Sequence, residues 1–313
     1  MMATEEEFMS RSTKAEAHGE GAQRGRQARR GAYIIPSLFT IANVFCGYYA
    51  LTETAKAGLL LPNDLMLAAG HFDNAAKAIG FAVLFDGLDG RIARLMGTTS
   101  PFGQELDSLA DTITFGIAPA FLAFVWGIHA VVGNPTALDP PFLESAGWVV
   151  TFLWVVCSAA RLARFNTHSM AQVARSERPE HSKFVGMPTP ASAGIVAAIV
   201  HFNFGIPMTT PMWVPFWLVL LTATSALMVS TWRYYSFKGL DFRRRRGFVM
   251  VILLGTLFAM IWFYSHVVLL LIASSYWLSG VISKLLQARR RKLGLGEAGD
   301  AAHAEHSPSG HHA

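Results

Sequence analysis

Long apolar segments alternate with short polar segments along most of the chain. Eight of the apolar segments come close to the roughly 20 residues with which an α-helix crosses a lipid bilayer. The pattern predicts helices at Ala32–Ala55, Ala75–Met96, Gly103–Val132, Leu143–Phe165, Pro188–Phe204, Thr210–Trp232, Gly247–Tyr264 and His266–Leu286. The sequence therefore indicates an all-α integral membrane protein with about eight transmembrane helices, of which the fifth is the shortest.

The basic residues support this number of helices and give it an orientation. If both ends of the chain are cytoplasmic, all of the 26 Lys and Arg residues except Lys56 and Lys77 lie on the cytoplasmic side. The connections at 133–145 and 202–211 carry no Lys or Arg. Because cytoplasmic loops of membrane proteins are enriched in Lys and Arg, we expect both termini to be cytoplasmic.

The two ends of the chain differ from the apolar middle. Residues 1–31 are polar and charged and lack the apolar core of a signal peptide, so they predict a cytoplasmic arm followed by a retained first helix. Residues 32–288 form the predicted transmembrane domain. Residues 289–313 are mostly small and polar, as is typical of a disordered tail. The tail histidines could bind metal, but a solvated tail explains them more simply.

Composition and charge argue against a nucleic-acid-binding protein and against a disulfide-stabilised protein. The chain is 52% hydrophobic and 15% charged, and its net charge is +5. Its basic residues lie beside helix ends, where they match a membrane surface, so we expect a lipid bilayer and no nucleic acid as its partner. The two cysteines, Cys46 and Cys157, lie in apolar helices, which predicts small core residues and no disulfide framework.

Four aspartates interrupt the apolar pattern in two adjacent predicted helices. Asp86 and Asp89 are three residues apart in the second helix, and Asp107 and Asp111 are four residues apart in the third. Residues at these spacings share one face of an α-helix. The short connection at 95–102 makes the two helices antiparallel neighbours. We therefore expect all four carboxylates to face one space near the cytoplasmic end of the bundle.

Such a cluster needs a compensating charge. Ionised carboxylates a few Å apart repel strongly when they are partly desolvated, so they either hold protons or bind a cation. Oxygen ligands alone favour Mg²⁺ or Mn²⁺, which complete their shell with phosphate oxygens and water. Arg94 offers a fork of donors suited to phosphate, and Gly90 and Gly103 let a ligand approach closely. A proton or cation pathway is the alternative, because carboxylates in membrane helices also mark such pathways.

The spacing of these residues resembles the signature of the CDP-alcohol phosphotransferases. The matching pattern is Asp86-x2-Asp89-Gly90-x2-Ala93-Arg94-x8-Gly103-x3-Asp107-x3-Asp111. The resemblance implies membrane enzymes with a six-helix core, here followed by two C-terminal helices, and usually a homodimer. It also implies that Asp86, Asp89, Asp107 and Asp111 bind one or two divalent metals and that Asp111 is the catalytic base. By the same resemblance, the donor is contacted by Gly90, Arg94, Gly103 and Ser100.

Four other stretches resemble bacterial phosphatidylserine synthases within that family. They are "IPSLFTIANVFCGYYA", "RLARFN", "FVGMPTPASAG" and "LMVSTWRYYSFK", in this order between about residues 33 and 240. The resemblance implies CDP-diacylglycerol as donor, L-serine as acceptor and a bacterial inner membrane as location. Glycerol 3-phosphate, inositol phosphate or choline are the alternative acceptors.

Small polar and basic residues near cytoplasmic helix ends supply the remaining candidates. Ser37, Thr40 and Asn43 are candidate donor-binding residues, although Ser37 and Thr40 could equally be helix caps. An arginine fork suits the carboxylate of serine, and an amide could take its ammonium group. The candidate acceptor-binding residues are Arg161, Arg164, Asn166 and Lys183. The basic ones could instead be topology anchors only.

Overall fold

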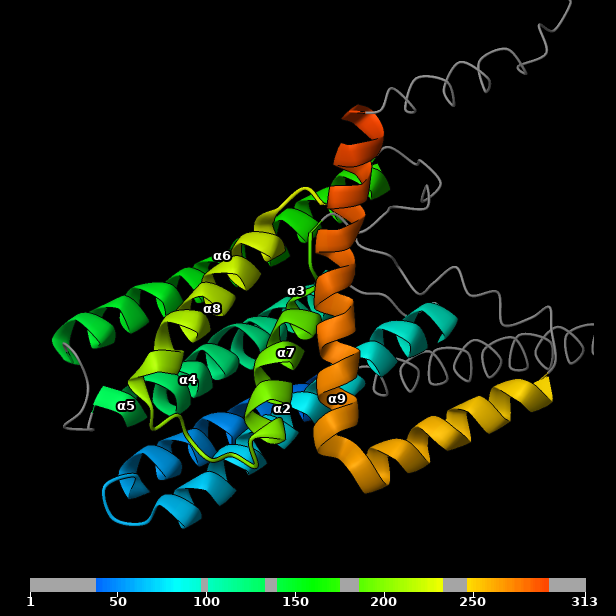
Figure 1. Cartoon of the computed structure of the whole chain (residues 1–313). Coiled ribbons are helices and arrows are strands. Elements are labelled where there is room, and N and C mark those ends of the chain that lie inside the picture. The colour runs from blue at the N-terminus through cyan, green and yellow to red at the C-terminus, as the bar shows by residue number, and fades with distance from the viewer. Residues whose placement is uncertain (1–37, 97–100, 133–139, 175–185, 233–246, 293–313) are drawn as a thin grey trace, which may run out of the picture.

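The structure is a computed structural model that describes residues 38–96, 101–132, 140–174, 186–232 and 247–292, and in these ranges it contains helices and no strand (Figure 1). The first helix occupies residues 38–60. The elements that follow are α2 (Leu65–Met96), α3 (Pro101–Asp111), α4 (Ala118–Phe124), α5 (Ala130–Val132), α6 (Pro140–Ala174), α7 (Thr189–Phe202), α8 (Val214–Val229) and α9 (Gly247–Lys292). The prediction of an all-α chain is therefore confirmed for this part of the sequence.

Four helical stretches in the described ranges are long and apolar enough to cross a membrane. They are Phe102–Val132, Pro140–Thr167, Pro211–Val229 and Ala259–Ile282. α7 is apolar but shorter. α2 is not among the four, and it contains the charged residues Asp73, Lys77 and Asp86. The structure thus supports an integral membrane protein with four clear spans.

The third predicted span is one continuous helix with two π-helical turns. The turns η1 (Thr112–Ile117) and η2 (Val125–His129) join α3, α4 and α5. η1 begins directly after Asp111, and Trp154 of α6 donates its indole N–H to the Phe115 carbonyl of that turn over 3.3 Å. Short π-helical turns are rare and often occur at functional sites. This one joins the acidic end of the helix to the apolar remainder.

The helices pack in pairs around a core rich in alanine. α2 lies against α7, α6 against α8, and α7 also against α9. The buried residues of the first two helices include Ala50, Ala57, Ala68, Ala75 and Ala82. Small side chains let membrane helices approach each other closely, which strengthens van der Waals contact. Cys46 and Cys157 are both free, as predicted.

Several helix boundaries differ from the prediction. α2 begins at Leu65 rather than Ala75, because its polar residues Asp73 and Lys77 are paired by an ion pair of 2.7 Å and do not end the helix. α9 runs from Gly247 to Lys292, beyond the predicted end of the last helix. It contains a non-helical residue, Tyr264, at the predicted end of the seventh helix. Figure 1 shows the sharp bend between the two arms of α9.

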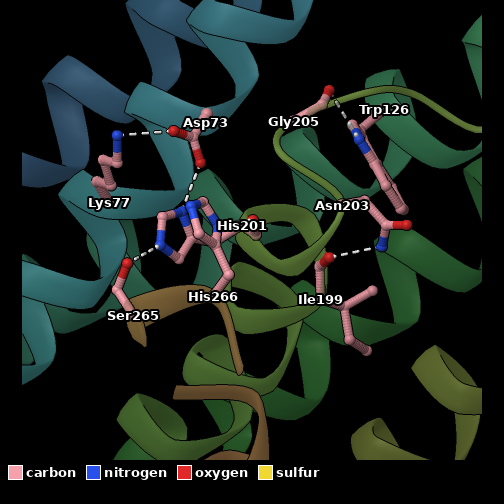
Figure 2. A network of polar contacts seen from close by, with 9 residues as sticks. All are labelled: Asp73, Lys77, Trp126, Ile199, His201, Asn203, Gly205, Ser265 and His266. Atoms are coloured by element: carbon pink, nitrogen blue, oxygen red, sulfur yellow. Dashed lines mark hydrogen bonds and ion pairs between the residues drawn. The ribbon is translucent and has the colours of Figure 1, made fainter. Parts of the chain in front are cut away.

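α7 ends at Phe202, earlier than predicted, because the chain turns there with two left-handed residues. Phe204 has a φ of 55° and Gly205 a φ of 71°. A Cβ at Gly205 would lie 2.0 Å from the Ala69 carbonyl oxygen, so only glycine fits. Trp126 donates its indole N–H to the Gly205 carbonyl over 3.1 Å, which fastens the turn to the long third span (Figure 2).

Gly47 sets how closely the first helix lies against η1. A Cβ at Gly47 would lie 2.4 Å from Thr114 Oγ1 and 2.9 Å from Thr114 Cα. The Thr114 hydroxyl donates to the Asn43 carbonyl over 3.1 Å in the same contact. The glycine therefore permits the hydrogen bonds that hold the first helix against the acidic end of the third span.

Replacing Gly47 by Ala should lower the free energy of unfolding by about 1–3 kcal/mol, because the backbone atom Cα of Thr114 cannot give way cheaply. Gly80→Ala is the matched control, since nothing lies within 4 Å of a Cβ built at that helical glycine. It should leave stability unchanged or raise it slightly. Thermal unfolding of both purified variants in detergent measures the difference. Equal melting temperatures would contradict this account of the contact.

Candidate active site

Three of the four aspartates meet between α2 and the C-terminal half of α3. Asp86 of α2 and Asp107 and Asp111 of α3 each present one carboxylate oxygen, and these oxygens lie within 4.8 Å of one another. Asp89 lies in α2 one turn after Asp86, but its side chain is outside the described part of the structure. The α-helical geometry of α3 up to Asp111 keeps Asp107 and Asp111 on one face.

Two buried oxygen atoms of this cluster have no hydrogen-bond partner among the described residues. They are Asp107 Oδ1 and Asn43 Oδ1. Asn43 lies on the first helix and donates its amide N–H to Asp111 Oδ1 over 3.2 Å. Buried polar atoms are nearly always paired in native proteins. The unpaired oxygens therefore fit a site completed by a bound group, a cation at Asp107 and a donor group at Asn43.

Arg161 of α6 brings a positive charge to the carboxylates. Its side chain is buried, and its Nε has no hydrogen-bond partner among the described residues. It is close enough to Asp86 and Asp111 to attract both electrostatically, and it also interacts with Tyr276 of α9. Arg161 therefore compensates part of the negative charge and presents a buried donor to the same site.

Two other candidate residues of α6 are engaged in contacts between helices. Arg164 donates from Nη1 to the Val229 carbonyl, the last residue of α8, over 3.1 Å. Asn166 donates from Nδ2 to Ser108 Oγ over 2.9 Å, beside Asp107 on α3. The arginine thus binds a carbonyl at the C-terminus of α8. The negative end of the helix dipole at that terminus favours a cation. The asparagine links α6 to the acidic face of α3.

The remaining candidates are distributed around the cluster or fall outside the described residues. Thr40 is buried on the first helix, and Gly103 is half-buried on α3. Gly90 and Arg94 lie in α2, although the surroundings of Gly90 and the side chain of Arg94 are not described. Ser37, Ser100 and Lys183 lie outside the described ranges.

An apolar groove runs beside the cluster, between the first helix and α3. It has a volume of about 410 Å³, and its lining consists of Thr40, Ile41, Val44, Phe45, Tyr48 and Leu106. Thr40 lies one helical turn from Asn43, and Leu106 precedes Asp107. The groove is therefore an apolar surface lined by helix neighbours of Asn43 and Asp107, although no carboxylate lines it.

Sequence reasoning did not identify Ser108 or Tyr276 as neighbours of the site. Ser108 stands next to Asp107 in the motif, and its position on α3 is the signal that could have identified it. Tyr276 lies in an apolar helix far along the chain from Arg161, and nothing in its local sequence marks it. Its proximity depends on how α9 packs.

Comparison with known proteins identifies the family. The model of the CDP-alcohol phosphatidyltransferase family matches residues 33–204, more than half of the chain. The chain belongs to this family. The match includes Asn43, the aspartates and Arg161, whereas α8 and α9 follow it. Together with the apolar helices, membership of this family identifies an integral membrane protein.

Several curated relatives carry the name CDP-diacylglycerol–serine O-phosphatidyltransferase. The one from Mycobacterium leprae is 34% identical over 205 residues, which is 63% of this chain and 56% of the relative. The one from Helicobacter pylori is 32% identical over 230 residues, or 72% of this chain and 82% of the relative. The one from Bacillus subtilis is 30% identical over 205 residues, which is 91% of the relative. The chain thus spans little more than half of the mycobacterial relative and most of the other two.

Proposed function

We propose that this protein transfers the phosphatidyl group of CDP-diacylglycerol to L-serine, forming phosphatidylserine and releasing CMP. The observation that carries the proposal is the cluster of Asp86, Asp107 and Asp111 with an unpaired buried oxygen on Asp107. The names of the relatives supply the substrates. A buried arginine beside carboxylates and an adjacent apolar groove suit a lipid diphosphate substrate.

The oxygen-only donor set fits one or two Mg²⁺ or Mn²⁺ ions. Asp86, Asp107 and Asp111 would hold them, with Asp89 from the next turn of α2. When bound, such ions neutralise phosphate oxygens and the leaving CMP.

Asp111 is the proposed base. The amide of Asn43 holds one of its oxygens at 3.2 Å, which fixes the orientation of the carboxylate. Asp111 takes the proton of the serine hydroxyl while that oxygen attacks the phosphorus that carries diacylglycerol. The bond from this phosphorus to the CMP oxygen breaks. A carboxylate is a weak base for an alcohol, so positioning of the substrates must lower much of the barrier.

The donor is proposed to lie between the first helix, α2 and α3. The unpaired Asn43 Oδ1 accepts a hydrogen bond from the nucleotide, and Thr40 and Gly103 are further proposed donor contacts. Gly90, Arg94, Ser37 and Ser100 remain predicted donor contacts. The apolar groove that starts at Thr40 takes an acyl chain of the lipid.

Among the acceptor candidates, Arg161 is the one proposed to bind the serine carboxylate. It is buried beside Asp86 and Asp111, whereas Arg164 reaches the end of α8 and Asn166 reaches Ser108. A phosphate-bearing acceptor such as glycerol 3-phosphate would need several basic side chains at one point. Of the described candidates only Arg161 is both buried and next to the carboxylates, which favours serine. Lys183, which lies outside the described residues, remains a predicted acceptor contact.

Replacing Arg161 by Lys should raise the KM for serine roughly tenfold to a hundredfold. A charge-assisted hydrogen bond in a desolvated site contributes ~1.5–3 kcal/mol, and lysine keeps the charge but loses the planar fork. The KM for CDP-diacylglycerol should stay unchanged. Arg164→Lys, the control from the next turn of α6, should alter melting temperature and neither KM. Steady-state kinetics with both substrates varied would contradict the assignment if Arg161→Lys did not weaken serine selectively.

The membrane arrangement that goes with this function is also a proposal. We infer eight spans, of which six form the core and two follow it. Both termini and the aspartates lie on the cytoplasmic side of a bacterial inner membrane. The protein is proposed to form a homodimer. The four clear apolar spans and the distribution of Lys and Arg support this topology. Cysteine accessibility in inverted and right-side-out vesicles tests the orientation.

One assay tests the function as a whole. Purified protein is incubated with CDP-diacylglycerol, Mg²⁺ or Mn²⁺ and a panel of serine, glycerol 3-phosphate, inositol phosphate and choline, and CMP release is measured. Serine should give the fastest release. A faster rate with another alcohol would retain the reaction class and replace the acceptor. Cation flux without CMP release would favour the transporter alternative.

A further inference from the structure

A second polar cluster lies at the other end of the bundle from the aspartates. It consists of Asp73 on α2, His201 on the last turn of α7, and Ser265 and His266 directly after the bend in α9 (Figure 2). One ligand atom from each of Asp73, His201 and His266 lies within 4.8 Å of the others. With a rise of about 1.5 Å per residue, α2 places Asp73 about 20 Å from Asp86. The two clusters are therefore separate sites.

The hydrogen bonds define which ring nitrogens carry protons. His266 Nδ1 lies 2.6 Å from the His201 carbonyl oxygen, which can only accept, so this nitrogen donates. His201 Nδ1 lies 2.5 Å from Asp73 Oδ1, and it donates to that carboxylate. In neutral rings both Nε2 atoms then keep their lone pairs. The lone pair of His201 Nε2 faces the Ser265 hydroxyl at 3.0 Å.

This arrangement matches the way proteins prepare histidines for metal binding. A metal-ligating histidine almost always donates its other ring N–H to a carboxylate or a backbone carbonyl, which fixes the tautomer and the ring orientation. His201 has the carboxylate and His266 has the carbonyl. The two rings also lie against each other, with centroids 4.0 Å apart and an interplanar angle of 23°.

We propose that His201 and His266 bind a divalent ion of the zinc class that ties α7 to the bend of α9. Imidazole nitrogens suit Zn²⁺ and its neighbours, in contrast to the oxygen-only cluster at the other end. Asp73 orients His201 through Oδ1, while its Oδ2 pairs with Lys77 at 2.7 Å. The Ser265 hydroxyl and water complete the shell. Phe204 covers the His266 ring, with centroids 4.1 Å apart, and shields the site.

The test measures Zn²⁺ binding to the full chain in detergent. All proteins carry Ser at His303, His306, His311 and His312, so that the tail does not contribute, and they carry no histidine tag. Millimolar Mg²⁺ is present throughout to occupy the aspartates. Calorimetric titration of the metal-stripped parent should show one Zn²⁺ site, and Zn²⁺ should raise the melting temperature. Co²⁺ in its place should give the visible absorption of nitrogen coordination.

Three variants and one control decide the outcome. His266→Gln and His201→Gln should each abolish the site, and Asp73→Asn should weaken it about tenfold to a hundredfold as an orienting carboxylate does. His129→Gln, an exposed histidine at the end of the third span, should leave it intact. A single symmetric peak in size-exclusion chromatography and a cooperative thermal unfolding transition report that each variant is folded. If the variant at the buried residue His201 fails to fold, His266→Gln alone tests the proposal.

The proposal is overturned if the parent binds no Zn²⁺ in excess over Mg²⁺. It is also overturned if folded His266→Gln keeps the same affinity and the same Zn²⁺-induced rise in melting temperature as the parent. Because the test reads binding and stability, loss of the proposed transferase function alone would leave its result unchanged.

Discussion

Replacing Asp107 by Asn should reduce CMP release by at least about a hundredfold at saturating metal. Substituting a group that merely orients a metal ligand typically costs tenfold to a hundredfold, and loss of a ligand itself should cost no less. Asp107 is the aspartate whose Oδ1 is buried without a hydrogen-bond partner among the described residues, so it has most to lose from an absent cation. The change removes one charge and almost no volume.

Glu105→Gln is the matched control for this experiment. It is the same conversion of carboxylate to amide on α3, but Glu105 is exposed and stands outside the cluster. It should release CMP at the wild-type rate. Removal of divalent metal from the wild type by a chelator should stop CMP release, as Asp107→Asn does, and added Mg²⁺ or Mn²⁺ should restore it.

Stability gives an independent readout of the same substitution. Three carboxylate oxygens within 4.8 Å repel one another when no cation is bound. Asp107→Asn should therefore raise the melting temperature of the metal-free protein while it lowers activity. A folded variant that released CMP normally at saturating metal would show that Asp107 is not a metal ligand.

Local helix geometry explains why the acidic cluster could be predicted from the sequence. The four-residue spacing of Asp107 and Asp111 places them on one face of any α-helix, and α3 is α-helical up to Asp111. The short connection then brings Asp86 of α2 beside them. Each step uses neighbouring residues and needs no knowledge of distant packing.

The partners of the cluster could not be predicted in the same way. Asn43 reaches Asp111 because Gly47 lets the first helix lie against Thr114, a contact between distant segments. Nothing local separates Arg161 from Arg164, since both lie on α6 among apolar residues. Only the packing of α6 against α8 places Arg164 at Val229 and leaves Arg161 at the carboxylates.

The histidine cluster shows the same limit more clearly. Asp73 and His201 interrupt apolar segments that are far apart in the sequence, and each resembles an ordinary polar residue near a helix end. Their pairing depends on the contact between α2 and α7 and on the bend of α9 at Tyr264. Periodicity predicts that such a bend exists between two apolar segments, but not which side chains it brings together.

Replacing Asp111 by Asn should lower kcat by about a hundredfold to ten-thousandfold, the range that general bases contribute. The KM for CDP-diacylglycerol should change little. Asn43 donates a hydrogen bond to Asp111 and holds its carboxylate in one orientation. If the distinctive role of Asp111 is to accept a proton in the transition state, its loss should lower turnover rather than donor binding. The asparagine variant keeps the shape of the side chain but cannot accept that proton.

Asn43→Ser separates the base from the residue that orients it. Serine can still donate a hydrogen bond but is too short to reach Asp111 Oδ1 in the same geometry. This variant should retain the base but lose its positioning and the proposed contact of Asn43 with the donor, so at saturating donor its kcat should fall less than that of Asp111→Asn. Single-turnover kinetics with pre-bound donor measure the chemical step in both variants. If Asp111→Asn instead lost donor binding while its bound fraction reacted at the wild-type rate, Asp111 would be a binding residue, and the proton of serine would have to leave by another route.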